Sequence, residues 1–261
     1  MKISAITSFN EKYYTLIGQY NVGSWLKNWP ENLTLTCYVE ECKLEDDPRL
    51  IQIPFNELGD SYFKFQQSNY KSRVKTFAKK AYSIIHAMEN LDTDFIVWID
   101  ADVLTFNKID KKFLDFIKDE KYLATFMGVL HSRHDDDPDG ELMFSCESSF
   151  FVLNKNHKYF NEFAKRYREY YDLGLTENLR RFYDGEVLGA TIKDFESKAD
   201  MRELNEGHHY KTPMPRTFLK DYLIHFKAGL KDQTDLNISI QKVIGETKIL
   251  KIISSNNSQT S

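Results

Sequence analysis

Five consecutive apolar residues, FIVWI from Phe95 to Ile99, restrict the fold more than any other stretch of the chain. A strand buried on both faces of a parallel sheet has this unbroken pattern, whereas a strand with one face in water alternates. Apolar residues at helical spacing from Val74 to Met88 come just before it and predict a helix that packs on such a sheet. Strand and helix in alternation indicate an α/β domain with a largely parallel sheet.

Other segments extend this pattern along the chain. Further strands are predicted over residues 2–8, 33–39, 50–53, 122–129, 148–153 and 222–226, and further helices over 13–27, 157–171 and 236–244. We therefore expect one α/β domain over residues 1–253, with a Rossmann-like, mostly parallel central sheet flanked by helices. The polar tail over residues 254–261 is expected to be disordered.

Composition excludes several classes of protein. The net charge of −4 provides no global basic field for nucleic acid or anionic membrane. The three cysteines are odd in number and lack the CxxC spacing of zinc sites, which favours a reducing compartment. No apolar run approaches the 18 residues of a membrane span, so we expect a cytoplasmic enzyme, in a bacterial cell or a phage-infected host.

Two carboxylates, Asp100 and Asp102, follow the buried strand directly. Ligands bind at the carboxyl ends of parallel strands, so these side chains are predicted to enter a binding crevice. Two nearby carboxylates repel each other unless a cation neutralises them, and Mg²⁺ or Mn²⁺ prefers such oxygen ligands. A solvated acidic turn would carry the same two residues, because DxD is a short motif.

A second candidate segment is YLIHFKAGLK, Tyr222 to Lys231, in which His225 ends an apolar run. Gly229 and Lys231 follow it. Read alone, this is a strand-end histidine with solvated lysines.

In this order the two segments resemble the DxD and closing HxxGxxK motifs of GT-A glycosyltransferases. The resemblance implies a donor site that includes Asp100, Ala101 and Asp102, with His225 completing the shell of a Mn²⁺ or Mg²⁺ ion. It implies that Lys231 neutralises the leaving diphosphate and that Gly229, one place later than in the commonest motif, lets the backbone approach it. The nucleotide-binding half would then span about residues 1–106 and the acceptor half about 107–253.

Between these motifs, two further segments are similar to family elements. CESSFFVLN, Cys146 to Asn154, resembles the strand whose residues face the donor sugar, which assigns that contact to Glu147 and Ser148. FYDGEVLGATI resembles the acidic turn beneath the acceptor, with Asp184 or Glu186 as its functional carboxylate. A helix N-cap and first turn would carry the same two acids.

The nucleotide side of the resemblance involves two upstream segments. Arg73 and Lys80, on the predicted helix that precedes FIVWI, are the basic residues placed to reach the nucleotide. Thr7, near the end of the first strand, is placed to contact the base or ribose. A solvated helix face is the alternative reading for the basic residues.

The resemblance predicts transfer of a sugar from a nucleotide diphosphate sugar, a UDP-sugar, to a saccharide or other hydroxyl acceptor, by a hexosyl- or pentosyltransferase. Hydroxymethylated bases of phage DNA are an alternative acceptor. An alternative enzyme class is a phosphatase of the haloacid-dehalogenase type, which also carries DxD after an apolar strand and would use Asp100 as its nucleophile. Retention or inversion at the transferred sugar stays open, as does the oligomeric state.

Overall fold

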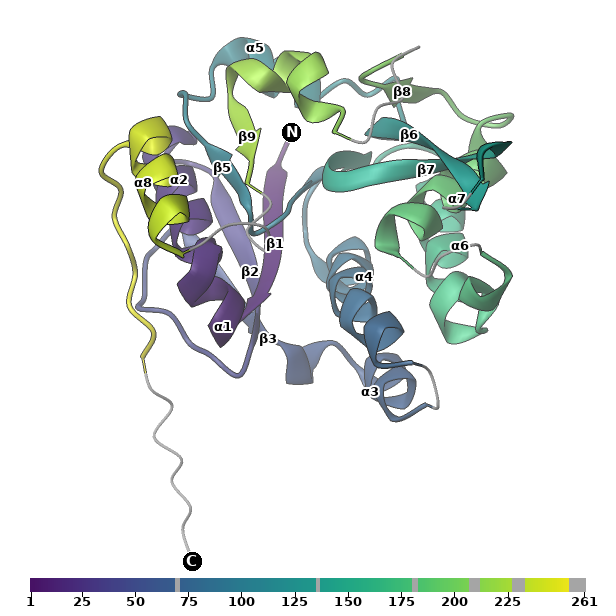
Figure 1. The fold of residues 1–261 in the computed structure, drawn as a ribbon, viewed down its shortest axis with the longest axis horizontal. Helices are drawn as coiled ribbons and strands as arrows, with labels where there is room; N and C mark the ends of the chain where they lie inside the picture. Colours follow the sequence, from purple (N-terminus) through teal and green to yellow (C-terminus); the bar gives the residue numbers. More distant parts are fainter. Residues whose placement is uncertain (69–70, 135–136, 180–182, 207–211, 227–232, 254–261) are drawn as a thin grey trace, which may run out of the picture.

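The computed structural model describes residues 1–253 except 69–70, 135–136, 180–182, 207–211 and 227–232. Within these residues, seven strands form one sheet in the order β3-β2-β1-β4-β7-β6-β8 (Figure 1). Pairing is parallel from β3 through β4 and between β6 and β8, and β7 is antiparallel to both of its neighbours. Six of the seven described strands therefore point the same way, which confirms the prediction of a mostly parallel α/β sheet.

The strand boundaries agree with the sequence patterns where the apolar signal is continuous. The main-sheet strands are β1 (Ile3–Asn10), β2 (Thr34–Glu40), β3 (Leu50–Pro54), β4 (Phe95–Ile99), β6 (Ala124–His134), β7 (Asp137–Asn154) and β8 (Met201–Glu203). A second, antiparallel sheet pairs β5 (Val103–Thr105) with β9 (Leu223–His225). β5 and β8 are too short for a periodic pattern and were not predicted.

Helices cover both faces of the main sheet (Figure 1). They are α1 (Glu11–Tyr13), a π-helical turn (Tyr14–Gly18), α2 (Gln19–Asn28), α3 (Asp60–Gln67), α4 (Ser72–Asn90), α5 (Lys111–Ile117), α6 (Phe160–Asp172), α7 (Asp184–Phe195) and α8 (Gln233–Ile244). Short 3₁₀ turns lie at Phe55–Glu57, Leu175–Asn178, Met214–Arg216 and Phe218–Asp221. None of the helices among the described residues is both long and apolar enough to cross a bilayer.

β4 lies at the centre of the sheet and contributes to two cores. Ile96 and Trp98 pack among residues of α4, α6 and α7, whereas Phe95, Val97 and Ile99 pack among residues of α2 and α5. All five side chains are buried, which is the physical reason for the continuous apolar run. The strand therefore delivers its carboxyl end, and Asp100 after it, to a fixed position.

The C-terminal segment binds back onto the N-terminal half. Lys27 Nζ of α2 donates to the carbonyl oxygen of Ile244 at 2.8 Å, at the end of α8. Leu44 and Ile252 then form an antiparallel bridge, and Tyr14 donates its hydroxyl to the Leu250 carbonyl at 2.8 Å. The described residues at the end of α8 and after it thus pack on the N-terminal half of the chain.

The first turn of α7 approaches β7 so closely that it requires glycine. A Cβ atom at Gly185 would lie 2.2 Å from the Cys146 carbonyl oxygen. Alanine normally stabilises a helix relative to glycine. Here Gly185→Ala should instead lower the free energy of unfolding by about 1–3 kcal/mol, because α7 must move away from β7. Urea denaturation measures the change.

The control is Gly18→Ala, where the nearest atom to the new Cβ would be Tyr14 Cδ2 at 3.3 Å, on a ring that can shift. We expect Gly18→Ala to cost less than Gly185→Ala. Equal stability of Gly185→Ala and the unmodified protein would contradict the close contact of α7 with β7.

Candidate active site

The turn after β4 is held by backbone and amide hydrogen bonds. The Asp100 amide donates to the Ser149 carbonyl at 2.9 Å, and the Val103 amide donates to the Asp100 carbonyl at 2.9 Å. Asn21 Nδ2 of α2 donates to the carbonyl oxygens of Asp100 and Val103 at 3.2 and 2.5 Å. Because Asn21 is buried, its hydrogen bonds hold the turn that carries Asp100 and Asp102 in a fixed position.

Asp102 and His225, two of the three predicted metal ligands, meet at this turn. β5 and β9 pair Val103 with His225, and the Phe226 amide donates to the Asp102 carbonyl at 2.7 Å. Asp102 Oδ1 lies 3.3 Å from His225 Nε2, and Asp102 Oδ2 accepts the Tyr13 hydroxyl at 2.9 Å. Two segments distant in sequence therefore supply one carboxylate–imidazole pair.

This pairing changes the protonation chemistry of both partners of Asp102. Burial alone would lower the pKa of His225, but the hydrogen bond and charge of Asp102 more than offset it and raise that pKa. Burial and the adjacent carboxylate of Asp102 raise the pKa of the Tyr13 hydroxyl, so that it stays a proton donor at neutral pH. Tyr13 was not singled out in the sequence, because a tyrosine in a helix usually belongs to the core.

Asp100 faces the opposite way, toward a buried lysine. Lys80 Nζ of α4 lies 2.6 Å from Asp100 Oδ1 and 2.7 Å from Asp184 Oδ2 of α7. It also donates to the carbonyl oxygen and hydroxyl of Ser148 at 2.8 and 3.1 Å, and Ser148 Oγ donates to Asp184 Oδ2 at 2.5 Å. Trp98 Nε1 donates to Asp100 Oδ1 at 2.6 Å. One cation therefore joins α4, the end of β4, β7 and the start of α7.

The charges of this cluster support one another. Burial would lower the pKa of Lys80, but Asp100 and Asp184 more than offset burial and raise it, so Lys80 is a cation at neutral pH. Burial would raise the pKa of Asp184, but Lys80 and the Ser148 hydroxyl outweigh burial and lower it. Burial raises the pKa of Asp100 to about 6 despite Lys80, and the nearby carboxylates of Asp102 and Asp184 add to that rise.

The donor set at this turn fits a hard divalent cation. The 3.3 Å between Asp102 Oδ1 and His225 Nε2 is close to the roughly 3 Å that separates adjacent ligands of an octahedral ion with bonds of about 2.1 Å. Asp100 has one oxygen engaged by Lys80 and Trp98, and its Oδ2 has no hydrogen-bond partner among the described residues. Because Asp100 turns toward Lys80, no three acidic, histidine or cysteine side chains of the described residues are already grouped as a metal site. Two carboxylates and an imidazole are nevertheless the ligand types that Mn²⁺ accepts.

The remaining predicted site residues lie at different distances from this centre. Ala101, between the two aspartates, is 3% exposed. Glu147 of β7 is half-buried, and its charge contributes to the raised pKa of His225. Glu186 is in the first turn of α7 and is buried. Gly229 and Lys231 lie outside the described residues.

Thr7 and Arg73, the residues predicted to contact the nucleotide, have different surroundings in the structure. Thr7 is 0% exposed in the middle of β1, three residues before the strand ends at Asn10, so its burial gives no support to a donor contact. The Arg73 guanidinium carbon lies over the ring of Tyr183, the residue before Asp184, at 5.0 Å from the ring centroid. Burial in a strand centre and ring contacts between helices are tertiary features with no local sequence signal.

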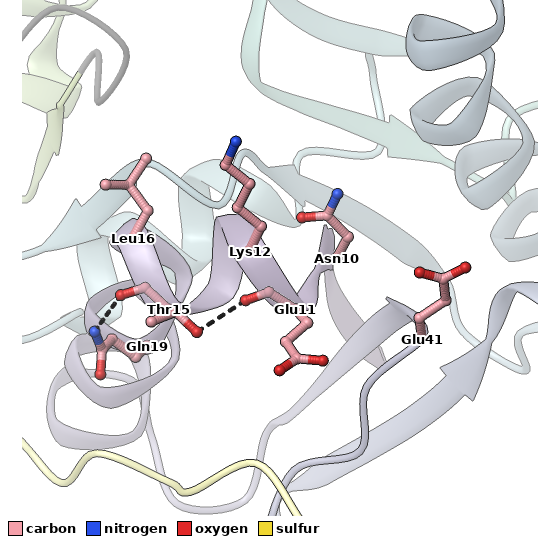
Figure 2. Close-up of a pocket in the computed structure, with 7 residues that line it drawn as sticks. All are labelled: Asn10, Glu11, Lys12, Thr15, Leu16, Gln19 and Glu41. Carbon is pink, nitrogen blue, oxygen red and sulfur yellow. Dashed lines mark hydrogen bonds between the residues drawn. The ribbon is translucent and has the colours of Figure 1, made fainter. Parts of the chain in front are cut away.

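A cavity of about 820 Å³ opens beside α1, at the carboxyl edge of β1 (Figure 2). Six of the seven residues that line it are polar or charged, and the seven are Asn10, Glu11, Lys12, Thr15, Leu16, Gln19 and Glu41. The Asn10 side chain caps α1 by accepting the Tyr13 amide at 2.7 Å. The cavity and the Asp102–His225 pair are thus joined through Tyr13, whose hydroxyl binds Asp102.

Several solved structures have a fold similar to that of this chain. Mouse xyloside xylosyltransferase 1 is 12% identical, with a TM-score of 0.54 over 89% of this chain and 100% of that one. The chain has the fold of GT-A glycosyltransferases. The galactosyltransferase LgtC, solved with donor and acceptor sugar analogues, is 9% identical, with a TM-score of 0.53 over 92% of this chain and 96% of that one.

A third match extends over part of a larger protein. The bifunctional glycosyltransferase WbbM is 12% identical, with a TM-score of 0.51 over 93% of this chain and 50% of that one. No protein-family model and no curated protein matches the sequence. Identities this low establish the shared fold, and the chemistry must be argued from the residues of this chain.

Proposed function

We propose that the chain is a metal-dependent glycosyltransferase that moves a sugar from a nucleotide diphosphate sugar, a UDP-sugar, to a saccharide acceptor. The observation that carries the proposal is the Asp102–His225 pair, 3.3 Å apart at the carboxyl edge of a sheet with the GT-A fold. Ligands of such sheets bind at this edge.

Asp102, His225 and the second oxygen of Asp100 would hold Mn²⁺ or Mg²⁺. When bound there, the ion neutralises charge on the diphosphate of the donor. Tyr13 orients Asp102, and the backbone bond from Phe226 keeps β9 against the turn. Lys231, six residues beyond His225, is proposed to stabilise the leaving diphosphate, and Gly229 to allow its close approach.

The donor nucleoside is proposed to bind in the cavity beside α1, which opens at the same sheet edge (Figure 2). The volume of about 820 Å³ lies in the range of small-molecule sites. Asn10, at the end of β1, and Glu11, at the start of α1, replace Thr7 as the polar groups proposed to meet the base or ribose. Lys80, Glu147 and Ser148 are proposed to border the donor sugar.

The two acids of α7 differ in what they can do. A general base needs a pKa near the working pH and room to take a proton. Asp184 has a lowered pKa and is bound by Lys80 and Ser148, so we assign it a positioning role. Glu186 is then the carboxylate proposed to accept the acceptor proton if the enzyme inverts. A retaining enzyme would pass that proton to a leaving-phosphate oxygen.

The phosphatase alternative receives less support from the structure than from the sequence. Its nucleophile would be Asp100, but Asp100 Oδ1 accepts hydrogen bonds from both Lys80 and Trp98 at 2.6 Å. The three solved structures compared above are glycosyltransferases. DNA stays the second acceptor class, and with a net charge of −4 it would have to bind on a local basic surface.

A donor-by-acceptor screen tests the proposed function. The purified protein with Mn²⁺ is incubated with the common UDP- and GDP-sugars, and nucleotide release is scored with water, simple saccharides, or DNA containing 5-hydroxymethylcytosine. We expect release from a UDP-sugar that saccharides accelerate and added salt does not abolish. Phosphate release from small esters, with no release from any donor, would overturn the assignment.

A further inference from the structure

One face of α4 points at the start of α7. Arg73, Phe77 and Lys80 are spaced by four and then three residues, which places them in a row on a helix surface. Lys80 binds Asp184, and the Phe77 ring packs edge-on against Tyr183 with centroids 4.7 Å apart. Arg73 lies over the same tyrosine ring at 5.0 Å. Exposure increases along the row, from the nearly buried Lys80 through half-buried Phe77 to exposed Arg73.

Arg73 is held in place by a contact that leaves its hydrogen-bond donors available. Stacking on an aromatic face uses the face of the guanidinium, whereas its N–H groups point outward in the plane. Among the described residues no carboxylate pairs with Arg73. The arginines at 166, 168 and 202, by contrast, each form an ion pair with an aspartate. Arg73 is therefore an oriented cation whose anionic partner is not supplied by the described part of the chain.

The position of Arg73 along α4 places it away from Lys80, which the proposed function sets beside the donor sugar. α4 leads into β4, so its first turn lies at the carboxyl edge of the sheet. Seven residues of helix separate Arg73 from Lys80, which is about 10 Å along the axis at 1.5 Å per residue. Arg73 instead borders Tyr183, the residue that precedes the Asp184–Glu186 turn, and the proposed function assigns that turn to the acceptor.

We infer that Arg73, oriented by Tyr183 and Phe77, binds an oxyanion carried by the saccharide acceptor, either a phosphate or a carboxylate. The inference rests on the proposed function, because that function defines which side of the site receives the acceptor. It assigns Arg73 to the acceptor, not to the nucleotide as its basic character alone suggested. A planar guanidinium matches phosphate and carboxylate geometry with two parallel hydrogen bonds.

Matched acceptors test this inference. Glucose, galactose and mannose are each compared with their 6-phosphate and their uronic acid, with kcat/KM measured for the unmodified protein and for Arg73→Gln. We expect the unmodified protein to prefer the anionic member by about 10–100-fold, the range for hydrogen bonds to charged groups. Arg73→Gln should reduce that preference to less than about threefold by raising the KM of the anionic acceptor. The KM of the donor should change less than the KM of the acceptor.

A binding measurement makes the test independent of turnover. Titration of each sugar 6-phosphate by calorimetry should show saturable binding that Arg73→Gln weakens by the same factor. Tyr183→Phe keeps an aromatic face and should keep the preference, whereas Tyr183→Leu should lose most of it. Lys111→Gln removes an exposed cation on α5, far along the chain from this face, and should leave the preference unchanged.

Three results would overturn the inference while leaving the proposed glycosyltransferase activity itself standing. One is a higher donor KM in Arg73→Gln with an unchanged acceptor preference, which would place Arg73 on the nucleotide. Another is equal use and equal binding of neutral and anionic sugars by the unmodified protein. The third is Arg73-dependent transfer to hydroxymethylated DNA alone. Failure of the proposed function differs from all three, because no nucleotide would be released from any donor.

Discussion

Asp102→Asn should abolish sugar transfer and leave the fold intact. Asparagine keeps an oxygen that can accept the Tyr13 hydroxyl, now 2.9 Å away, so the local packing is preserved. It removes the negative charge that pairs with His225 and that a divalent cation requires. Groups that only orient a metal ligand already change metal affinity or activity by about 10–100-fold, so loss of a ligand should exceed about 10²-fold.

Nucleotide release over a Mn²⁺ titration measures this effect, and thermal unfolding of the same samples shows whether the fold is kept. Asp115→Asn, on the exposed surface of α5, is the matched control and should behave as the unmodified protein. Full turnover in excess EDTA would contradict the metal site at Asp102 and His225. A much lower melting temperature of Asp102→Asn would show instead that the Asp102–His225 pair stabilises the fold.

The central part of the fold could be predicted because its signals are local. β4 carries an unbroken apolar run and α4 a helical stripe, and both formed where the pattern placed them. The same reasoning places Asp100 and Asp102 at a sheet edge. It also places His225 at the end of a strand, but the edge where β9 lies follows only from its pairing with β5. That pairing is three residues long, too short for any sequence pattern to specify.

The connections among site residues could not be predicted, because they depend on which buried charges face each other. Lys80 is one of several basic residues on α4, and its neighbour Lys79 pairs with Glu40, not with the site. Neighbouring positions on a helix differ by a rotation of about 100°, and this rotation decides that Lys80 faces the site and Lys79 faces Glu40. Thr7 lies near the end of the strand predicted over residues 2–8, but β1 continues to Asn10 and Thr7 is fully buried within it.

Removing Lys80 should have the largest effect on stability of any single change at this site. Lys80 is the cation between Asp100 and Asp184, and its side chain is 13% exposed. Lys80→Met would leave the carboxylates of Asp100 and Asp184 without their shared cation. Removing one partner of a buried ion pair lowers the free energy of unfolding by about 3–5 kcal/mol. Transfer should be lost as well, because Lys80 holds α7 against the end of β4.

Lys79→Met is the matched control on the same helix. Its partner is Glu40, and the two side chains are 30% and 19% exposed, so the pair is better solvated than that of Lys80. We expect a loss of about 1 kcal/mol or less. Urea denaturation at neutral pH compares the two variants. Lys80→Met combined with Asp184→Asn should recover at least half of the lost stability, because one uncompensated charge is gone, while transfer stays absent.

The pH dependence separates a charge effect from a packing effect. In the unmodified protein the pKa of Asp184 is lowered, so its stabilising contribution is present above the pKa of the unfolded chain and is lost as pH falls. Without Lys80, burial should raise the pKa of Asp184 and raise that of Asp100 above about 6. The loss of unfolding free energy in Lys80→Met should therefore be greatest at neutral pH. It should shrink as pH falls toward about 4, where the carboxyl groups of the unfolded chain titrate. A difference between the two proteins that stays constant over this range would mean that Lys80 acts through packing alone.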